Sequence, residues 1–385
     1  MDKEERSVEE ELRRHRLYRF LVPVVLLILV LTAAAIYWFF VLRNGFSRAD
    51  LVGKYEASEK GPASYSSFAG GFLRYSRDGV SFLDADGQEK WNTSFSMEQP
   101  RLVLHGDYGA IADISGRRVV VFSGSGLSGT YSTNADILGI AVSAGGLTAI
   151  ALDKDLTSLI QLYDATGKRL DIEMSFEMSM SGYPLAMALS PDGAGLVISF
   201  VNSSIGSLNS QIAFYNFSVG KSEPDRLIGF FRYEGQLLPQ VDYLGAGRVV
   251  AVGDSSLEFF SLAQENKPVL IKSIPLPSEI SVYEAGNGHA AFLYSDPSTG
   301  KMTLNVYDTE GELNFMAETS GSFRSLVLAE KGVLFLSDTG LSYRDYKGRV
   351  RYSGSPAQTG SVMFMDGARK IIQFDGSYMY HYRLR

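Results

Sequence analysis

A tight turn between two short apolar strands recurs eight times in this chain, and the repeat restricts the fold more than any other feature. Each turn is rich in Gly or Asp, as around Gly109 (LHGDYGAIADI) and Gly193 (ALSPDGAGLVISF). Successive turns lie 35 to 54 residues apart, and they centre on Gly70, Gly109, Gly146, Gly193, Gly247, Gly288, Gly332 and Gly367. Units repeated in this order are typical of a repeat protein.

A second marker follows each turn, namely an alternating apolar strand that usually ends in Asp or Asn and often leads into a Gly turn. Examples are LIQLYDATGK, with Asp164 and Gly167, and LNVYDTEGE, with Asp308 and Gly311. Three to four such strands, each of about five residues, would form an antiparallel meander that cannot bury both of its faces. Radial stacking of the meanders buries both faces, and the repeat length matches that of a β-propeller blade.

The sequence therefore predicts an all-β, eight-bladed β-propeller ectodomain over residues 51–385, preceded by one transmembrane α-helix; a seven-bladed ring is the alternative if the terminal repeats merge. The sequence stops at Arg385, after the third strand of the last repeat, which leaves the last blade without an outer strand. Leu51–Ala57 (LVGKYEA) is a spare strand ahead of the first repeat. We expect this strand to complete the last blade and to join the two ends of the ring.

An uncharged run of 23 residues, Phe20–Leu42, precedes the repeats. At 1.5 Å per residue the run is long enough to cross a bilayer core of about 30 Å. A signal peptide cleaved after Ala33–Ala35 is the alternative, but the apolar run continues past Ala35 for longer than is usual in such peptides. We expect a cytoplasmic tail (1–19), a transmembrane signal-anchor helix (20–42), a juxtamembrane linker (43–50) and an extracytoplasmic propeller (51–385).

The orientation follows from the length of the tail and from the charges beside the run. Four arginines lie closely before it and three Lys or Arg residues closely after it, and a short N-terminal tail commonly stays inside the cell. We therefore expect a single-pass protein of the cell membrane with a cytoplasmic N-terminus and an extracellular C-terminal domain, anchored in the lipid bilayer through residues 20–42.

The composition excludes several classes of function. The chain has 36 Lys and Arg against 43 Asp and Glu, and an acidic ectodomain argues against nucleic acid as a partner. It has no cysteine, which removes disulfides, thiolate metal sites, thiol nucleophiles and a lipidated Cys anchor. The ectodomain must therefore be held together by its core and its strand ladders.

Several turns resemble those of known propeller superfamilies. SPDG at Ser190–Gly193 resembles a WD40 turn, and LDADGQEKW at Leu83–Trp91 and YDATGK at Tyr163–Lys168 resemble the blade motif of quinoprotein-like propellers. The whole layout is similar to an uncharacterised family, of unknown function, of single-pass membrane-anchored propellers in Gram-positive bacteria. The resemblance implies an architecture more than an activity. Quinoprotein dehydrogenases carry an adjacent Cys pair and a calcium-held cofactor, so no cofactor is expected here.

Motifs for catalysis or metal binding are weak. Asp84, Asp86 and Glu89 resemble half of a calcium loop, but the other oxygen ligands are missing and a hairpin turn explains them better. A zinc site would require His105, His289 and His381 to come together in the fold, although they lie in three different repeats. No Gly-x-Ser-x-Gly elbow is present. We expect no metal site, no catalytic residue and no enzyme.

Loops on a rigid scaffold commonly carry binding, and two hairpin extensions stand out, Val201–Gln211 and Ser295–Lys301. The predicted function is protein binding or scaffolding in the bacterial cell envelope, with unidentified envelope or membrane proteins as partners. One alternative is a sensor of wall glycan or peptide, and another is a glycan hydrolase or lyase with its site on the propeller axis. The candidate binding residues are Asn202, Ser204, Asn209 and Asp296.

Overall fold

The computed structural model divides the chain into two compact units, Met1–Ser47 and Arg48–Arg385. It describes residues 21–36, 45–57, 63–204, 207–218, 226–264, 267–296, 298–299, 301–319, 323–338, 340–354, 362–367 and 369–385. In the first unit, residues 21–36 are helical. Within the described ranges, no helix combines the length and the apolar character needed to cross a bilayer. The expected tail and both ends of the expected span, with part of the linker, lie outside the described residues.

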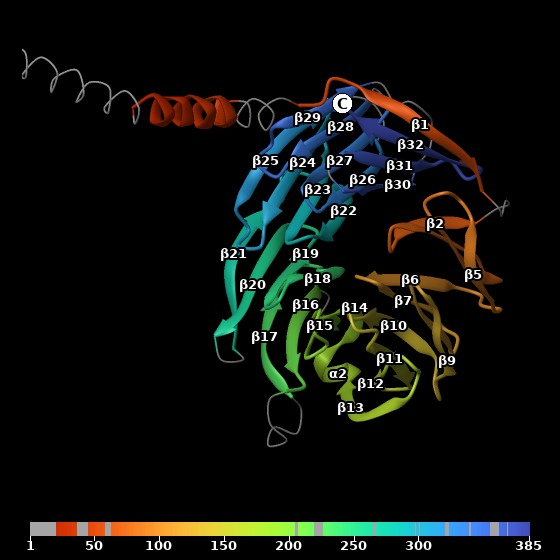
Figure 1. Ribbon diagram of the computed structural model, residues 1–385. Helices are drawn as coiled ribbons and strands as arrows, with labels where there is room; N and C mark the ends of the chain where they lie inside the picture. The colour runs from red at the N-terminus through yellow and green to blue at the C-terminus, as the bar shows by residue number, and fades with distance from the viewer. Residues whose placement is uncertain are drawn as a thin grey trace, which may run out of the picture. The chain divides into compact units, whose positions relative to one another are not determined.

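The second unit is a ring of eight four-stranded antiparallel sheets, as Figure 1 shows. This confirms the eight-bladed propeller, and the seven-bladed alternative was wrong. Blades 1 to 4 consist of β2 (Ser64–Phe68), β3 (Gly71–Tyr75), β4 (Gly79–Leu83), β5 (Glu89–Ser94), β6 (Pro100–His105), β7 (Tyr108–Asp113), β8 (Arg118–Ser123), β9 (Gly126–Ser132), β10 (Ile137–Val142), β11 (Thr148–Lys154), β12 (Thr157–Tyr163), β13 (Arg169–Glu177), β14 (Tyr183–Leu189), β15 (Gly195–Ser204), β16 (Ser207–Asn216) and β17 (Leu227–Tyr233). A short helix, α2 (Met178–Ser181), connects blades 3 and 4.

Blades 5 to 8 repeat the same arrangement, and the first strand of each blade lies nearest the axis, beside the first strands of its neighbours. Their strands are β18 (Gln240–Gly245), β19 (Arg248–Val252), β20 (Ser256–Gln264), β21 (Lys267–Pro275), β22 (Ile280–Gly286), β23 (His289–Ser295), β24 (Met302–Asp308), β25 (Leu313–Thr319), β26 (Phe323–Ala329), β27 (Gly332–Ser337), β28 (Gly340–Asp345), β29 (Val350–Gly354), β30 (Val362–Asp366), β31 (Lys370–Phe374), β32 (Tyr378–Leu384) and β1 (Ala49–Glu56).

The ring closes through its first and last strands. Strand β1 pairs antiparallel with β32, so the order in blade 8 is β1-β32-β31-β30. Figure 1 shows β1, in orange, lying along the blue strands of the C-terminus. The strand expected over Leu51–Ala57 therefore completes the last blade, as predicted, although it begins two residues earlier, at Ala49.

The Asp residues that mark the strand ends serve the turns that follow them. In blade 3, the Asp164 carboxylate accepts the backbone N–H groups of Thr166 (2.9 Å) and Lys168 (3.0 Å). Asp84 makes the same two contacts in blade 1 with the residues two and four positions on. Such local bonds satisfy backbone groups that the turn would otherwise leave unpaired. The calcium-like segment is therefore a hairpin turn of the repeat.

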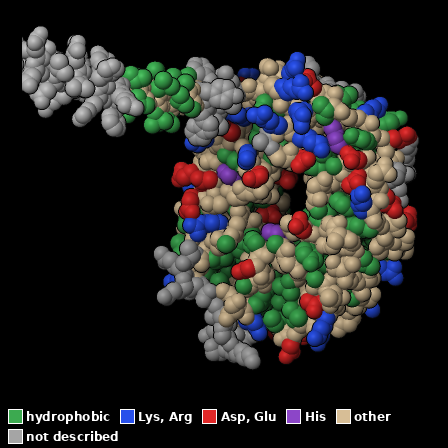
Figure 2. Space-filling view, in the orientation of Figure 1, with side chains coloured by type: hydrophobic (Ala, Val, Ile, Leu, Met, Phe, Trp, Pro, Cys, Tyr) green, Lys and Arg blue, Asp and Glu red, His purple; other side chains and the backbone are tan. Residues whose placement is uncertain are grey.

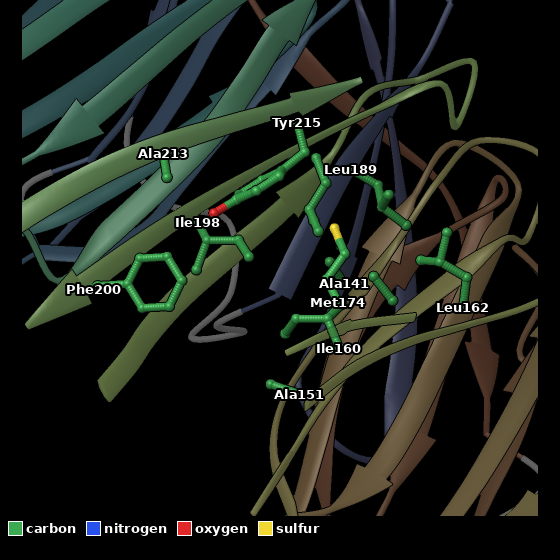
Figure 3. Close-up of a cluster of buried hydrophobic side chains, with 12 residues drawn as sticks. Ala141, Ala151, Ile160, Leu162, Met174, Leu189, Ile198, Phe200, Ala213 and Tyr215 are labelled. Atoms are coloured by element: carbon green, nitrogen blue, oxygen red, sulfur yellow. The ribbon is translucent and has the colours of Figure 1, made fainter. Parts of the chain in front are cut away.

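Apolar side chains fill the space between neighbouring blades. Between blades 3 and 4, Ile160 and Met174 pack with Ile198 and Phe200, as Figure 3 shows. Between blades 1 and 2, the Trp91 ring lies 5.4 Å from that of Phe122. The indole N–H of this tryptophan donates to a backbone carbonyl of blade 2 at 3.3 Å. Blade-to-blade burial of this kind stabilises the ring in place of disulfides.

Candidate binding surfaces

A cavity of about 670 Å³ lies at the axis of the propeller. Its lining comes from the inner strands β6, β10, β14, β18 and β22 of five blades and from the turns that follow them. Figure 2 shows the ring hollowed at its centre, with acidic side chains around the hollow. The described lining residues include Asp242 and His105 but no Lys or Arg.

Two carboxylates near the cavity have perturbed proton affinities. Asp242 accepts hydrogen bonds from the Tyr283 hydroxyl (2.9 Å) and the Gln240 amide (3.2 Å). Burial raises the pKa of Asp242 to about 6, despite these bonds. The Glu284 side chain is exposed at the surface, but the protein around it removes part of its hydration. This desolvation raises the pKa of Glu284 to about 7, and the negative charge of Asp242 adds to the effect. Both groups therefore change protonation near neutral pH.

The three histidines beyond the expected span have different neighbours. His105 lines the cavity, and burial lowers its pKa. The His289 ring stacks on that of Tyr346 with centroids 3.5 Å apart. His381 is buried in β32, with Nε2 2.6 Å from the carbonyl oxygen of Ala85. No group of three or more His, Asp or Glu within the described ranges is arranged to hold a metal ion.

The structure brings together three of the four residues predicted to bind. Asn202 in β15 faces Asn209 in β16, and Ser204 ends β15 in the same hairpin of blade 4. The Asn209 side chain accepts the N–H of Gly235 at 2.9 Å. The fourth residue, Asp296, lies in blade 6, in the turn after β23. Binding by these residues remains a prediction.

The Asp296 carboxylate is hydrogen-bonded to residues of its own turn. Its carboxylate accepts the Ser298 hydroxyl (2.6 Å), the Thr299 hydroxyl (2.6 Å) and the Ser298 backbone N–H (2.8 Å). These hydrogen bonds lower the pKa of Asp296 to about 2, because they favour the charged form. A ligand that approached Asp296 would have to compete with these local donors.

An apolar patch on blades 3 and 4 was not predicted from the sequence. We define the blade 3–4 patch by its four exposed side chains, Leu156 (82% exposed), Met180 (75%), Leu208 (52%) and Tyr183 (42%). In Figure 2, hydrophobic side chains gather over the region that Figure 1 labels α2. Exposed apolar groups that cluster on one face commonly mark an interaction site.

Backbone contacts hold the patch together. The N–H of Met178 donates to the carbonyl of Leu156 (3.0 Å), which ties α2 to the hairpin turn of blade 3. Tyr183 then pairs with Val201 in β15, close to the hairpin that carries Leu208. The sequence does hold a signal, since MSMSG interrupts the alternation between two strands and a leucine occupies a turn that usually prefers Gly or Asn.

Comparison with known proteins places the fold among described propellers. The Dos1 propeller is 14% identical with a TM-score of 0.54, and the match covers 87% of this chain and 95% of that one. Sqt1 of Chaetomium thermophilum, solved bound to the N-terminus of the ribosomal protein L10, is 11% identical with a TM-score of 0.54, covering 87% and 100%. BamB of Moraxella catarrhalis is 11% identical with a TM-score of 0.49, covering 88% and 100%.

The resemblance to propeller proteins is thereby confirmed, and at these identities it concerns the fold alone. No curated protein matches the chain. The model of a family of unknown function, DUF5711, matches residues 42–384. This match spans the whole propeller, and the chain belongs to that family.

Proposed function

We propose that the protein is a membrane-anchored, extracytoplasmic propeller that binds other proteins of the bacterial cell envelope and does not catalyse a reaction. The blade 3–4 patch is the observation that carries this proposal. Its most exposed member, Leu156, lies at the tip of a two-residue hairpin turn, where the core gains nothing from a leucine. Sqt1 binds a segment of another protein, so this fold is compatible with such a role.

The hairpin of blade 4 extends the same surface. Leu208 lies in this hairpin with Asn202, Ser204 and Asn209, so the two amides would supply polar contacts beside the apolar ones. Interfaces combine an apolar centre with a polar rim in this way. Asp296, on blade 6, would mark a separate contact.

Anchoring rests on the sequence of residues 20–42, which is uncharged throughout. The described helix, residues 21–36, has 16 residues, and all of them are exposed. A span needs about 20 residues, so residues 37–42 would have to continue it. Full-length protein should resist alkaline carbonate extraction from membranes, whereas a variant that lacks residues 20–42 should be released. Equal extraction of both would contradict the anchor.

Protein binding is tested by a photo-crosslinking amino acid at position 156 of the full chain in living cells. We expect adducts with one or a few envelope proteins. Position 127 in β9 is the matched control, because Leu127 is also an exposed leucine (51%) but belongs to a different blade. Adducts at both positions in equal amount, or at neither, would contradict binding through the patch.

One observation favours an enzyme as a second candidate. Asp242 and Glu284 could share the roles of acid and base, since their pKa values are raised to about 6 and about 7. A wall-glycan hydrolase or lyase on the propeller axis would use such a pair. Incubation with purified wall glycan should then release reducing or unsaturated ends. Loss of this release in both Asp242→Asn and Glu284→Gln would support an enzyme, and no release from the parent protein would dismiss it.

A glycan sensor has less support. Such a site needs exposed aromatic rings around the axis, and Tyr243, the aromatic residue in the described cavity lining, is 8% exposed.

A further inference from the structure

We propose that the blade 3–4 patch binds an amphipathic protein segment whose apolar side is flanked by Lys or Arg. The inference rests on the proposed protein-binding function and adds the chemical class of the partner. It follows from the apolar patch together with the charges at its edge.

The apolar part of the surface combines a backbone packed closely on blade 4 with adaptable side chains. Gly182 holds α2 against β15: its φ is +90°, and a Cβ there would collide with the carbonyl oxygen of Val201. The position therefore requires glycine, because the backbone of this loop lies directly against blade 4. Met180, carried by this loop, has an unbranched side chain that can adapt to different apolar partners. This combination suits a segment pressed onto the surface.

Acidic groups border the patch on the side of blade 3. Asp155 directly precedes Leu156 in the turn, and Glu177 directly precedes α2. Asp153 lies close enough to Tyr183 that its charge, added to the larger effect of burial, raises the pKa of that tyrosine. Two carboxylates are therefore chain neighbours of the patch, and a third lies close to Tyr183.

The side of blade 4 adds a fourth carboxylate. Glu234 directly precedes Gly235, whose N–H donates to the Asn209 side chain in the β15–β16 hairpin. The nearby cations among the described residues are Lys154, which ends β11 directly before Asp155, and Arg232, whose Nε lies 3.3 Å from Gln211. Counting the described residues, four carboxylates against two cations leave the rim negative.

The negative charge of the rim discriminates between partners that have an apolar face. An acidic partner or a nucleic acid would be repelled, whereas Lys or Arg beside the apolar contacts would be attracted. Exposed rim pairs add little affinity, so we expect the charges to act mainly on selectivity and on the rate of association, with a strong salt dependence. The apolar contacts supply the remaining stability.

The test uses two synthetic peptides of about 12 residues, an amphipathic length of about three helical turns. Both have leucines at the same positions, and the other positions are Lys in one peptide and Glu in the other. The full chain in detergent carries a benzophenone side chain at position 208, and the yield of covalent peptide adduct is measured. Counting only adducts excludes peptide bound to detergent.

We expect at least a fivefold higher yield with the Lys peptide than with the Glu peptide. Asp155→Asn with Glu177→Gln should reduce this ratio to less than twofold, and Leu156→Ser should lower the yield of both peptides. The benzophenone at position 127 should not discriminate between them. Both substitutions at the rim are close in size to the native residues and exposed, so folding should be unaffected.

Equal yields of the two peptides, or a ratio that the Asn and Gln substitutions leave unchanged, would overturn the inference. Adducts formed in cells from position 156 would then still support the broader function. Conversely, selection of the Lys peptide without any adduct in cells would support the surface chemistry and contradict the cellular role.

Discussion

Arg48 and Arg385 exchange two backbone hydrogen bonds: the N–H of Arg48 donates to the carbonyl of Arg385 (3.1 Å), and the N–H of Arg385 donates back (2.9 Å). These bonds extend the pairing of β1 with β32 by one residue beyond the strands. The first residue of the propeller unit is thereby fixed to the last residue of the chain. The stability of the ring should depend on this blade.

Blade 8 should be sensitive to loss of its core side chains. Phe374 is 1% exposed, and its ring centroid lies 4.7 Å from that of Tyr65 and 5.5 Å from that of Phe72, both in blade 1. We expect Phe374→Ala to lower the free energy of unfolding by about 3–5 kcal/mol, because it leaves a cavity between the blades that close the ring. Urea denaturation measures the change. Leu127→Ala, at an exposed site, should change it by less than about 0.5 kcal/mol.

Two glycine turns offer a matched comparison. Gly70 and Gly146 both have positive φ angles, of 75° and 81°. A Cβ on Gly146 would lie 2.5 Å from the Tyr108 ring and 2.8 Å from the Ala165 methyl, whereas a Cβ on Gly70 would meet nothing within 4 Å. Gly70→Ala should therefore cost about 1–2 kcal/mol of backbone strain, and Gly146→Ala should cost clearly more. Thermal denaturation of the two variants would show equal effects if packing at the turn did not matter.

The Asp turn should tolerate an amide but not a methyl group. Asp308 accepts the N–H groups of Glu310 (2.9 Å) and Glu312 (2.9 Å). Asp308→Ala leaves both donors without this partner and should cost about 1–2 kcal/mol, while Asn keeps an acceptor and should cost less. Adding Ca²⁺ should leave the melting temperature of the parent protein unchanged. A calcium-induced rise that Asp84→Asn removed would indicate a metal site in the blade 1 turn instead.

Stability should fall as the pH rises through the range where Asp242 titrates. An unfolded Asp has a pKa of about 3.9, and burial raises that of Asp242 to about 6 in the folded protein. The folded state therefore binds the proton more tightly, so the contribution is complete below about pH 4 and is lost as the pH rises through about 6. Allowing for solvent screening at this partly exposed group, Asp242→Asn should reduce this pH-dependent loss of stability by about 1–2 kcal/mol.

Asp296→Asn should change the pH dependence of stability in the opposite direction. Hydroxyl and N–H donors lower the pKa of Asp296 to about 2, so its contribution is present above about pH 4 and is lost as the pH falls toward 2. This variant should be less stable than the parent at pH 7, whereas Asp242→Asn should be more stable. Urea denaturation at pH 4, 5.5 and 8 distinguishes the two, and parallel pH profiles would refute the assignment.

The blades, their number and the closing strand could be predicted because they depend on local patterns. Turn glycines such as Gly193 and strand-end residues such as Asp164 form hydrogen bonds with residues only a few positions away. The sequence of each repeat therefore suffices to predict its own turns. The spare strand was found because the last repeat lacked a partner for β32. These inferences needed no knowledge of which side chains meet across the ring.

The candidate sites depend on contacts between residues that are far apart in the sequence, and such contacts cannot be predicted from local patterns. Tyr283 reaches Asp242 across 41 positions of sequence and from another blade. Leu156 and Tyr183 join one surface only because α2 folds back onto blade 4. The hairpin residues Asn202 and Asn209 could be selected because they share one turn, but their position beside an apolar patch could not be known.

The pairing of β1 with β32 also sets the order of events during synthesis. Residues 49–56 emerge from the ribosome long before residues 378–384, and at about 5–20 residues per second the delay is on the order of 15–70 s. Throughout that interval β32 does not yet exist, and β1 cannot occupy its native place. A chain exported as it is made would thus present unpaired strand edges until residues 378–384 arrive, and such edges are templates for pairing with another chain.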